Sequence, residues 1–206
     1  MIDSKSFWDK IATRYAKNPV RNEEVYEKKL SITQGYFKPD WKVFEFGCGT
    51  GSTAIVHAPH VGQFLASDIS PNMIAIAEEK RIAAGLDNLS FLEGTLESLA
   101  LEPNSFDAVL GLNILHLLDN VNETVASAYR LVKPGGIFVT STALIGHINP
   151  IFRSFIKVMQ WFGKAPFVNT FDKQTLLAAM TDAGFTIDHE WQPGKDSIFI
   201  VARKPL

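Results

Sequence analysis

Residues 43–51 read Val-Phe-Glu-Phe-Gly-Cys-Gly-Thr-Gly, and they carry the strongest signal for the fold. A short apolar run typical of a buried strand passes directly into three alternating glycines, Gly47, Gly49 and Gly51. Glycines at this point allow a tight turn and let a ligand approach the backbone closely. A short helix is expected from Ser52, so the stretch predicts a strand, a ligand-binding loop and a helix in immediate succession.

The rest of the chain repeats this alternation of strand and helix. Residues 6–37 have mostly helical spacing, and Ser70 followed by Pro71 is a strong helix start. Further helices are expected at 121–132 and 172–183, and strands at 41–46, 64–67, 89–92, 106–112, 137–142, 185–191 and 197–203. The alternation predicts a mostly parallel sheet in an α/β domain. The last two strands, joined by a Pro-Gly turn, are expected to be antiparallel.

Composition places the chain among ordinary globular domains. Its 206 residues suit a single domain, with 46% apolar and 20% charged residues. The formal net charge of -2 provides no basic field for nucleic acid. Cys48 is the only cysteine and the histidines have no metal-ligand spacing, so we expect neither a disulfide framework nor a metal site. The polar N-terminal residues and the lack of a long apolar run predict no signal peptide, no membrane span and a cytoplasmic location.

Two carboxylates accompany the glycine loop. Glu45, just ahead of it, suits a ligand that carries an ammonium group and is a poor neighbour for a pyrophosphate. Asp68 follows the second strand, where a carboxylate can accept hydrogen bonds from both ribose hydroxyls of a nucleoside. Two other readings of the loop remain. One is a tight turn that binds nothing, and the other is a dinucleotide-binding loop, whose third glycine would fall at Ser52 rather than at Gly51.

The segment E-F-G-C-G-T-G is similar to the acid-x-Gly-x-Gly-x-Gly motif of class I S-adenosylmethionine-dependent methyltransferases. The resemblance is closest to the small-molecule branch that includes quinone-biosynthesis methyltransferases, and it runs from FWDKIATRYA to the C-terminal strands. Other matching segments are FLASDISPNMIAIAEE, FLEGTLESLALEPNSFDAVLGLNILHLL and LVKPGGIFVTS. The resemblance implies a three-layer α/β/α Rossmann-like domain over 1–206. Its seven strands would have the order 3-2-1-4-5-7-6 with the last strand antiparallel, and residues 1–38 and 143–171 would form a helical lid and a helical insert.

The same resemblance implies S-adenosylmethionine as the cofactor, with a role for each matching residue. The three loop glycines would pass under the methionine portion of the cofactor. Glu45 would hold its ammonium group, to which Asn113 would also offer a backbone carbonyl, and Asp68 would bind the ribose. The residues implied at the adenine are Ile69, Met73, Thr95 and Leu96. The family commonly carries an aspartate where Thr95 stands, which is a departure in this chain.

Two residues are candidates for a part in catalysis. Tyr15 resembles a family tyrosine in an N-terminal lid, and simple helix packing explains it equally well. His116 follows the fourth strand, near the expected position of the transferred methyl group, and could act as a general base; a structural histidine is the alternative. A sulfonium is already activated, so the protein mainly has to align donor and acceptor.

The segment 143–171 interrupts the alternation with an amphipathic helix. No acidic residue occurs between Thr124 and Phe171, where the basic residues are Arg130, Lys133, Arg153, Lys157 and Lys164. These cations are interpreted as a solvated stripe, a site for an anionic acceptor or a peripheral contact with an anionic membrane surface. We expect the acceptor pocket between the segment around Tyr15, the loop 113–116 and the insert at 148–167.

Three functions fit these observations. The first is an enzyme that transfers a methyl group from S-adenosylmethionine to a small, partly apolar molecule. The second is a regulatory or partner subunit that binds S-adenosylmethionine without catalysis, since no catalytic acid or base is evident. The third is an oxidoreductase with a nicotinamide cofactor, which the spacing of Gly51 disfavours. The sequence predicts neither the acceptor, nor the atom that is methylated, nor the oligomeric state.

Overall fold

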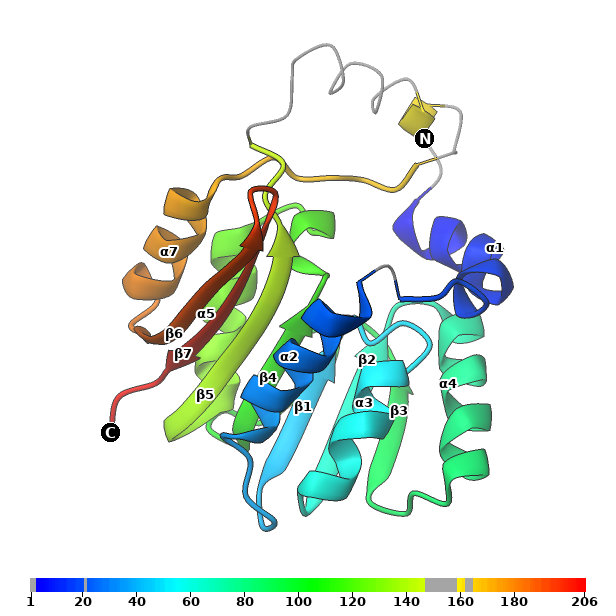
Figure 1. The fold of residues 1–206 in the computed structure, drawn as a ribbon, viewed down its shortest axis with the longest axis horizontal. Helices are drawn as coiled ribbons and strands as arrows, with labels where there is room; N and C mark the ends of the chain where they lie inside the picture. The colour runs from blue at the N-terminus through cyan, green and yellow to red at the C-terminus, as the bar shows by residue number, and fades with distance from the viewer. Residues whose placement is uncertain (1–2, 21, 147–158, 162–164) are drawn as a thin grey trace.

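The computed structural model describes residues 3–20, 22–146, 159–161 and 165–206. Within these residues seven strands form one sheet in the order β3-β2-β1-β4-β5-β7-β6, which confirms the expected order (Figure 1). The strands are β1 (Lys42–Phe46), β2 (Gln63–Asp68), β3 (Leu89–Glu93), β4 (Phe106–Leu112), β5 (Val132–Ala143), β6 (Thr186–Gly194) and β7 (Ser197–Arg203). Strands β1 to β5 are parallel, and β7 is antiparallel to both β5 and β6.

Helices cover both faces of the sheet, which gives the three layers (Figure 1). The helices are α1 (Ser4–Ala16), α2 (Glu23–Gln34), α3 (Ser52–His57), α4 (Pro71–Ala84), α5 (Val121–Leu131) and α7 (Lys173–Asp182), with 3-10 turns η1 (Ala58–His60) and η2 (Leu115–Leu117). Buried side chains of α5 and α7 share one apolar cluster with Phe44 and Val109, whereas α3 shares the other cluster with Val43 and Leu110. Successive residues of β1 and β4 thus enter opposite cores, because side chains alternate along a strand.

Local sequence accounts for the helix ends that frame the loop. Ser70 caps α4 by accepting a hydrogen bond from the Met73 backbone N–H at 3.1 Å, and Pro71 occupies the first turn. Gly85 ends the helix with a left-handed backbone at φ +65°. The expected start and end of this helix are therefore confirmed.

Two connections differ from the expectation. Strand β5 begins at Val132 instead of residue 137, because Val132 pairs with Phe106 and a register shift absorbs the Lys-Pro-Gly-Gly segment inside the strand. A Cβ on Gly136 would lie 2.6 Å from the Asp107 carbonyl oxygen, so only glycine fits this close approach. Strand β6 likewise continues to Gly194, and the turn to β7 falls at residues 195–196 instead of at the Pro-Gly pair.

The insert at 143–171 is described only in part. Its first residue ends β5, and residues 159–161 are helical, but most of the expected amphipathic helix, including Arg153, Lys157 and Lys164, lies outside the described residues. Lys133 does not join the insert in one basic stripe, because it stands at the beginning of β5 and pairs with Asp107 at 2.9 Å. In the described ranges, no helix is long and apolar enough to cross a membrane.

Candidate functional site

A cavity of about 810 Å³ opens at the carboxyl ends of β1, β2 and β4. Open α/β sheets bind ligands in this place, where the strand order reverses. The cavity is lined by the loop after β1, the ends of β2 and β4, and residues of α1 and α2. Most of the residues expected to bind the cofactor lie on its wall, namely Glu45, Gly47, Gly49, Asp68, Ile69, Met73, Thr95 and Asn113.

The three loop glycines all have left-handed backbones, but the space around their Cα atoms differs. A Cβ on Gly47 would lie 2.5 Å from Ile114, and one on Gly51 would lie 2.7 Å from Phe91, so both positions are closed by packing. On Gly49 the nearest atom would be a ring carbon of Tyr15 at 3.8 Å. Gly51 is not on the cavity wall, whereas Gly47 and Gly49 are. Position 51 requires glycine because its φ is +71° at the start of α3 and because Phe91 and Ala77 leave no room for a Cβ.

Glu45 is a buried carboxyl without a partner. Its side chain is 2% exposed, it lines the cavity, and its Oε2 atom accepts no hydrogen bond within the described part of the chain. Burial, together with the neighbouring Asp68, raises the pKa of Glu45 to about 8. A buried acceptor without a donor is costly, so this position is suited to a ligand that brings a positively charged donor.

Asp68 ties the end of β2 to the glycine loop. Its Oδ2 accepts a hydrogen bond from the Gly49 backbone N–H at 2.8 Å, and its Oδ1 accepts one from the Ser70 N–H at 2.9 Å. Burial raises the pKa of Asp68, and these two hydrogen bonds act in the opposite direction. Each oxygen can accept a second hydrogen bond, so Asp68 can hold the loop and still receive ligand hydroxyls.

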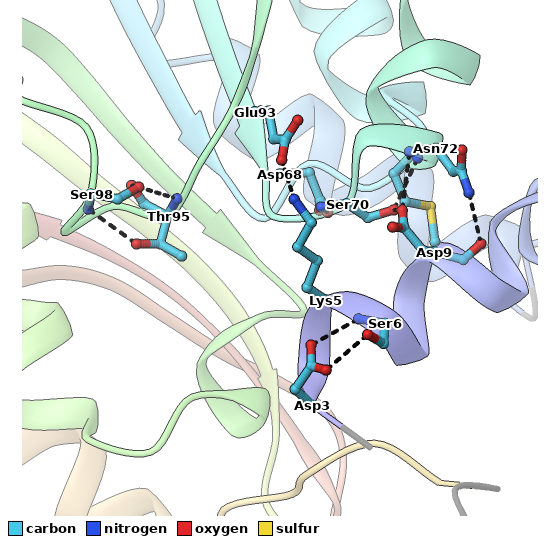
Figure 2. A network of polar contacts seen from close by, with 11 residues as sticks. Asp3, Lys5, Ser6, Asp9, Asp68, Ser70, Asn72, Glu93, Thr95 and Ser98 are labelled. Carbon is cyan, nitrogen blue, oxygen red and sulfur yellow. Dashed lines mark hydrogen bonds and ion pairs between the residues drawn. The ribbon is translucent and has the colours of Figure 1, made fainter.

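The expected adenine end of the cavity is formed in part. Ile69, Met73 and Thr95 line the cavity, whereas the Leu96 side chain is 2% exposed and belongs to the apolar core. The Thr95 hydroxyl accepts the Ser98 backbone N–H at 3.1 Å, and the Ser98 hydroxyl lies 2.8 Å from the Thr95 nitrogen (Figure 2). Thr95 therefore fixes its own loop through its hydroxyl, a hydrogen bond that the carboxylate of an aspartate could also accept.

Helix α1 covers the cavity and is attached at the start of α4. The Asp9 carboxylate accepts hydrogen bonds from the Ser70 hydroxyl at 2.5 Å and from the Asn72 N–H at 3.1 Å, and Lys5 pairs with Glu93 (Figure 2). At its other end α1 places Tyr15 on the cavity wall. The lid position of Tyr15 is therefore seen, while Asp9, which anchors it, carried no signal in the sequence beyond its place on a polar helix face.

The loop after β4 separates two of the expected residues. Asn113 lines the cavity with a left-handed backbone at φ +57°, held by its N–H, which donates to the Ser141 carbonyl at 2.6 Å. His116 is not on the cavity wall, and its Nδ1 lies 3.1 Å from the Thr142 hydroxyl. Burial lowers the pKa of His116 to about 4, so this ring is neutral at neutral pH. The structure thus ties His116 to β5 and does not place it on the cavity wall.

Lys29 lines the cavity and was missed in the sequence. It lies on α2, half-buried, and its ammonium donates to the Ser141 hydroxyl at 2.7 Å. Arg14 and Lys17, the N-terminal cations closest to Tyr15 in sequence, do not line the cavity. Among the described residues no group of three His, Cys, Asp or Glu side chains is arranged to hold a metal ion.

Comparison with known proteins agrees with this geometry. A family profile described as "Methyltransferase domain" matches residues 44–140, which run from β1 into β5. Residues 44–140, which include the glycine loop and the ends of β1, β2 and β4, therefore match a methyltransferase domain. The chain is similar to an uncharacterized methyltransferase of Bacillus subtilis, YcgJ, with 28% identity over 144 residues. That match covers 67% of this chain and 55% of the relative.

A second sequence relative and one solved structure are also similar to this chain. The chain is 35% identical over 106 residues to a ubiquinone/menaquinone biosynthesis C-methyltransferase of Brucella abortus, covering 50% of this chain and 39% of that protein. The crystal structure of the Bacillus protein YcgJ superposes with a TM-score of 0.72 at 17% identity, over 87% of this chain and 99% of that one, and so supports the fold. The chain spans 55% of the length of the first of these curated relatives and 39% of the length of the second.

Proposed function

We propose that this chain transfers a methyl group from S-adenosylmethionine to a small, partly apolar molecule. The observation that carries the proposal is the buried Glu45 carboxyl, whose Oε2 has no donor among the described residues and which lies beside the glycine loop on the cavity wall. The amino-acid end of S-adenosylmethionine carries an ammonium group of the right charge for this position. The sequence relatives named for methyl transfer support the same reading.

The residues on the wall fit the other parts of the cofactor. Gly49 leaves its side of the loop free for a ligand, since the nearest atom to a Cβ there would be 3.8 Å away. Asp68 keeps free lone pairs for ribose hydroxyls, and Ile69 and Met73 offer an apolar surface to the adenine. When bound, the cofactor supplies a methyl group on a positively charged sulfur. The residues of the chain then have to align the acceptor atom with the methyl group and the sulfur and to exclude water.

The apolar residues of the cavity wall suit the acceptor. They include Val20, Val25, Leu112, Ile114 and Leu117. Apolar walls with few polar groups are typical of sites for small organic molecules. The expected wall from the insert falls largely outside the described residues, and the described residues Met159, Gln160 and Trp161 do not line the cavity.

Calorimetry with three ligands tests the cofactor. S-adenosylmethionine and its demethylated product S-adenosylhomocysteine should bind, and NAD should not. Tight NAD binding together with no S-adenosylmethionine binding would overturn the proposal and favour an oxidoreductase.

A methyl-transfer screen then separates the enzyme from a non-catalytic subunit. S-adenosylmethionine labelled in its methyl group is incubated with the protein and a panel of small phenols, quinols and carboxylic acids. Label should move to at least one acceptor, and the transfer should disappear in Gly49→Val, in which the new side chain occupies the ligand's space. Binding without transfer to any acceptor would favour a regulatory or partner subunit.

A further inference from the structure

Lys29 is a half-buried cation without a carboxylate partner. Its ammonium donates to the Ser141 hydroxyl at 2.7 Å, and within the described part of the chain it makes no other hydrogen bond and no ion pair. An ammonium has three donor hydrogens and is strongly hydrated, so removing it from water is costly unless a partner takes them. Consistent with this, burial lowers the pKa of Lys29. Two of its three hydrogens are available to a ligand.

Lys29 is also the one basic side chain among the described residues that line the cavity. The acids on the wall are Glu45, Asp68 and the exposed Asp119. None of them forms an ion pair with Lys29. The cavity therefore has an acidic end and a separate cationic position.

Strand register shows how these two positions are separated. Glu45 on β1 aligns with Leu110 on β4, whereas Ser141, the partner of Lys29, lies on β5 and aligns with Leu112. Neighbouring strands are about 4.8 Å apart, so Glu45 and Ser141 stand on strands that are about 10 Å apart across the sheet. Glu45 and the partner of Lys29 are thus held on different strands of the cavity wall. A comparison of ligands with and without the cofactor's carboxylate distinguishes one bound molecule from two.

A further donor stands beside Lys29. The Ser141 hydroxyl, which accepts from Lys29, is 3.4 Å from the Asn113 Oδ1 atom. This contact directs the carboxamide oxygen toward Ser141, and the Nδ2 group of Asn113 makes no hydrogen bond within the described residues. A ligand oxyanion at this position would meet a cation and an amide donor, a combination that binds carboxylates and phosphates.

We propose that Lys29 recognises an oxyanion on the methyl acceptor, which makes the acceptor an acid with an apolar body. The inference rests on the proposed function, because the cofactor is taken to fill the end of the cavity at Glu45 and Asp68. The apolar wall around Val25 and Leu112 receives the body of the acceptor, while Lys29 holds its anionic group at the β5 side. Lys29 is thus a specificity-determining residue and takes no part in moving protons.

Paired probes test this assignment by titration calorimetry, with and without saturating S-adenosylhomocysteine. The pairs are benzoate with benzamide, octanoate with octanamide, and phenyl phosphate with phenol. Wild-type protein should bind at least one acid tenfold or more tightly than its neutral partner. Lys29→Met should lose this preference and Lys29→Arg should keep it. Because Lys29 makes a single hydrogen bond, Lys29→Met should fold, and Lys29→Gln provides a second neutral variant.

Lys28→Met is the matched control. Lys28 is the neighbour of Lys29 on the same helix, but its ammonium lies 4.3 Å from the centre of the Trp191 ring and it does not line the cavity. This variant should keep the preference for acids. The proposal is overturned if wild-type protein shows no preference in any pair, or if Lys29→Met and Lys29→Gln retain it.

A separate arm asks whether Lys29 binds the cofactor's own carboxylate. S-adenosylhomocysteine carries that group and 5′-methylthioadenosine lacks it. Lys29→Met should bind both within about twofold of wild type. A tenfold loss for S-adenosylhomocysteine alone would overturn the assignment to the acceptor. If wild-type protein binds neither nucleoside, the proposed function fails, while the titrations without cofactor still report on the anion preference.

Discussion

Gly49 and Gly85 have nearly the same left-handed backbone, with φ of +55° and +65°, in different surroundings. Gly49 lines the cavity, and a Cβ on Gly85 would meet nothing within 4 Å. Replacing either glycine by Ala should lower the free energy of unfolding by a similar amount, about 1–2 kcal/mol for a left-handed non-glycine residue. Only Gly49→Ala should also weaken S-adenosylhomocysteine binding, by tenfold or more in calorimetry. Equal affinities in the two variants would remove Gly49 from the site.

Glu45 should make the stability of the free protein depend on pH. The pKa of this carboxyl is raised from 4.5 to about 8, so between these values the folded protein binds more protons than the unfolded chain. Stability therefore falls as pH rises through this window. Glu45→Gln, which cannot ionise, should raise the melting temperature of the free protein, and the gain should grow from pH 5 to pH 8. A gain that is constant with pH would contradict a buried, protonated Glu45.

Glu45 should also release a proton when S-adenosylhomocysteine binds. A ligand ammonium beside Glu45 favours the carboxylate form, so S-adenosylhomocysteine should expel a proton near pH 7. Calorimetry in buffers of different ionisation enthalpy measures this release. Glu45→Gln should show less of it and bind more weakly, and 5′-methylthioadenosine, which has no ammonium group, should release none. Equal release from both ligands would exclude Glu45 as the partner of the ammonium.

Among the elements, α1 covers the cavity and is held to α4 by Asp9. The Asp9 carboxylate meets the beginning of α4, near the ribose-binding position proposed for Asp68 (Figure 2). At the other end of the helix, a ring carbon of Tyr15 would be the nearest atom to a Cβ on Gly49. Asp9→Ala removes hydrogen bonds to a charged group, each of which contributes about 1.5–3 kcal/mol. We expect faster hydrogen exchange throughout α1 and a threefold to tenfold loss of S-adenosylhomocysteine affinity.

Asp3→Ala is the control for helix stability alone. Asp3 caps α1 through the Ser6 N–H at 3.0 Å, and within the described residues its hydrogen bonds go to Ser6 and not to α4. Its loss should fray the first turn, at a cost of about 1 kcal/mol, and leave affinity almost unchanged. If the two variants behave alike, α1 does not act as an anchored cover.

For the whole molecule, the cavity joins elements that are far apart in the sequence. Residues from α1, α2, β1, β2 and the loop after β4 meet around one ligand position, so binding should stabilise the entire fold (Figure 1). At a ligand concentration of 100 times Kd the gain is about 2.7 kcal/mol. For a domain of this size the melting temperature should rise by about 5–10 °C with S-adenosylhomocysteine. Gly85→Ala should keep this shift, and Gly49→Ala should lose most of it; a shift preserved in both would place the ligand elsewhere.

Local sequence signals predicted the helices and strands, and most of the residues expected to bind the cofactor line the cavity. Hydrophobic period, helix caps and glycine stops are local signals, which is why β4 falls on residues 106–112 and α4 begins at Pro71 as expected. The sheet order and the positions of Glu45, Asp68 and Asn113 followed from the family motifs, since each stands next to a strand end. Local patterns failed where pairing with another strand decided the outcome. Val132 joins β5 because Phe106 pairs with it, which no propensity of 132–136 indicates.

The contacts of each side chain followed from the packing of elements that are distant in sequence. A Cβ on Gly51 would meet Phe91 and Ala77, because α4 and β3 pack against the start of α3. His116 is turned toward Thr142 of β5, and Lys29 on α2 reaches Ser141 of that same strand. A sequence states which residues share an element. Contacts between elements depend on how the helices pack on the sheet, and this packing brings Lys29, 112 residues away in sequence, to Ser141.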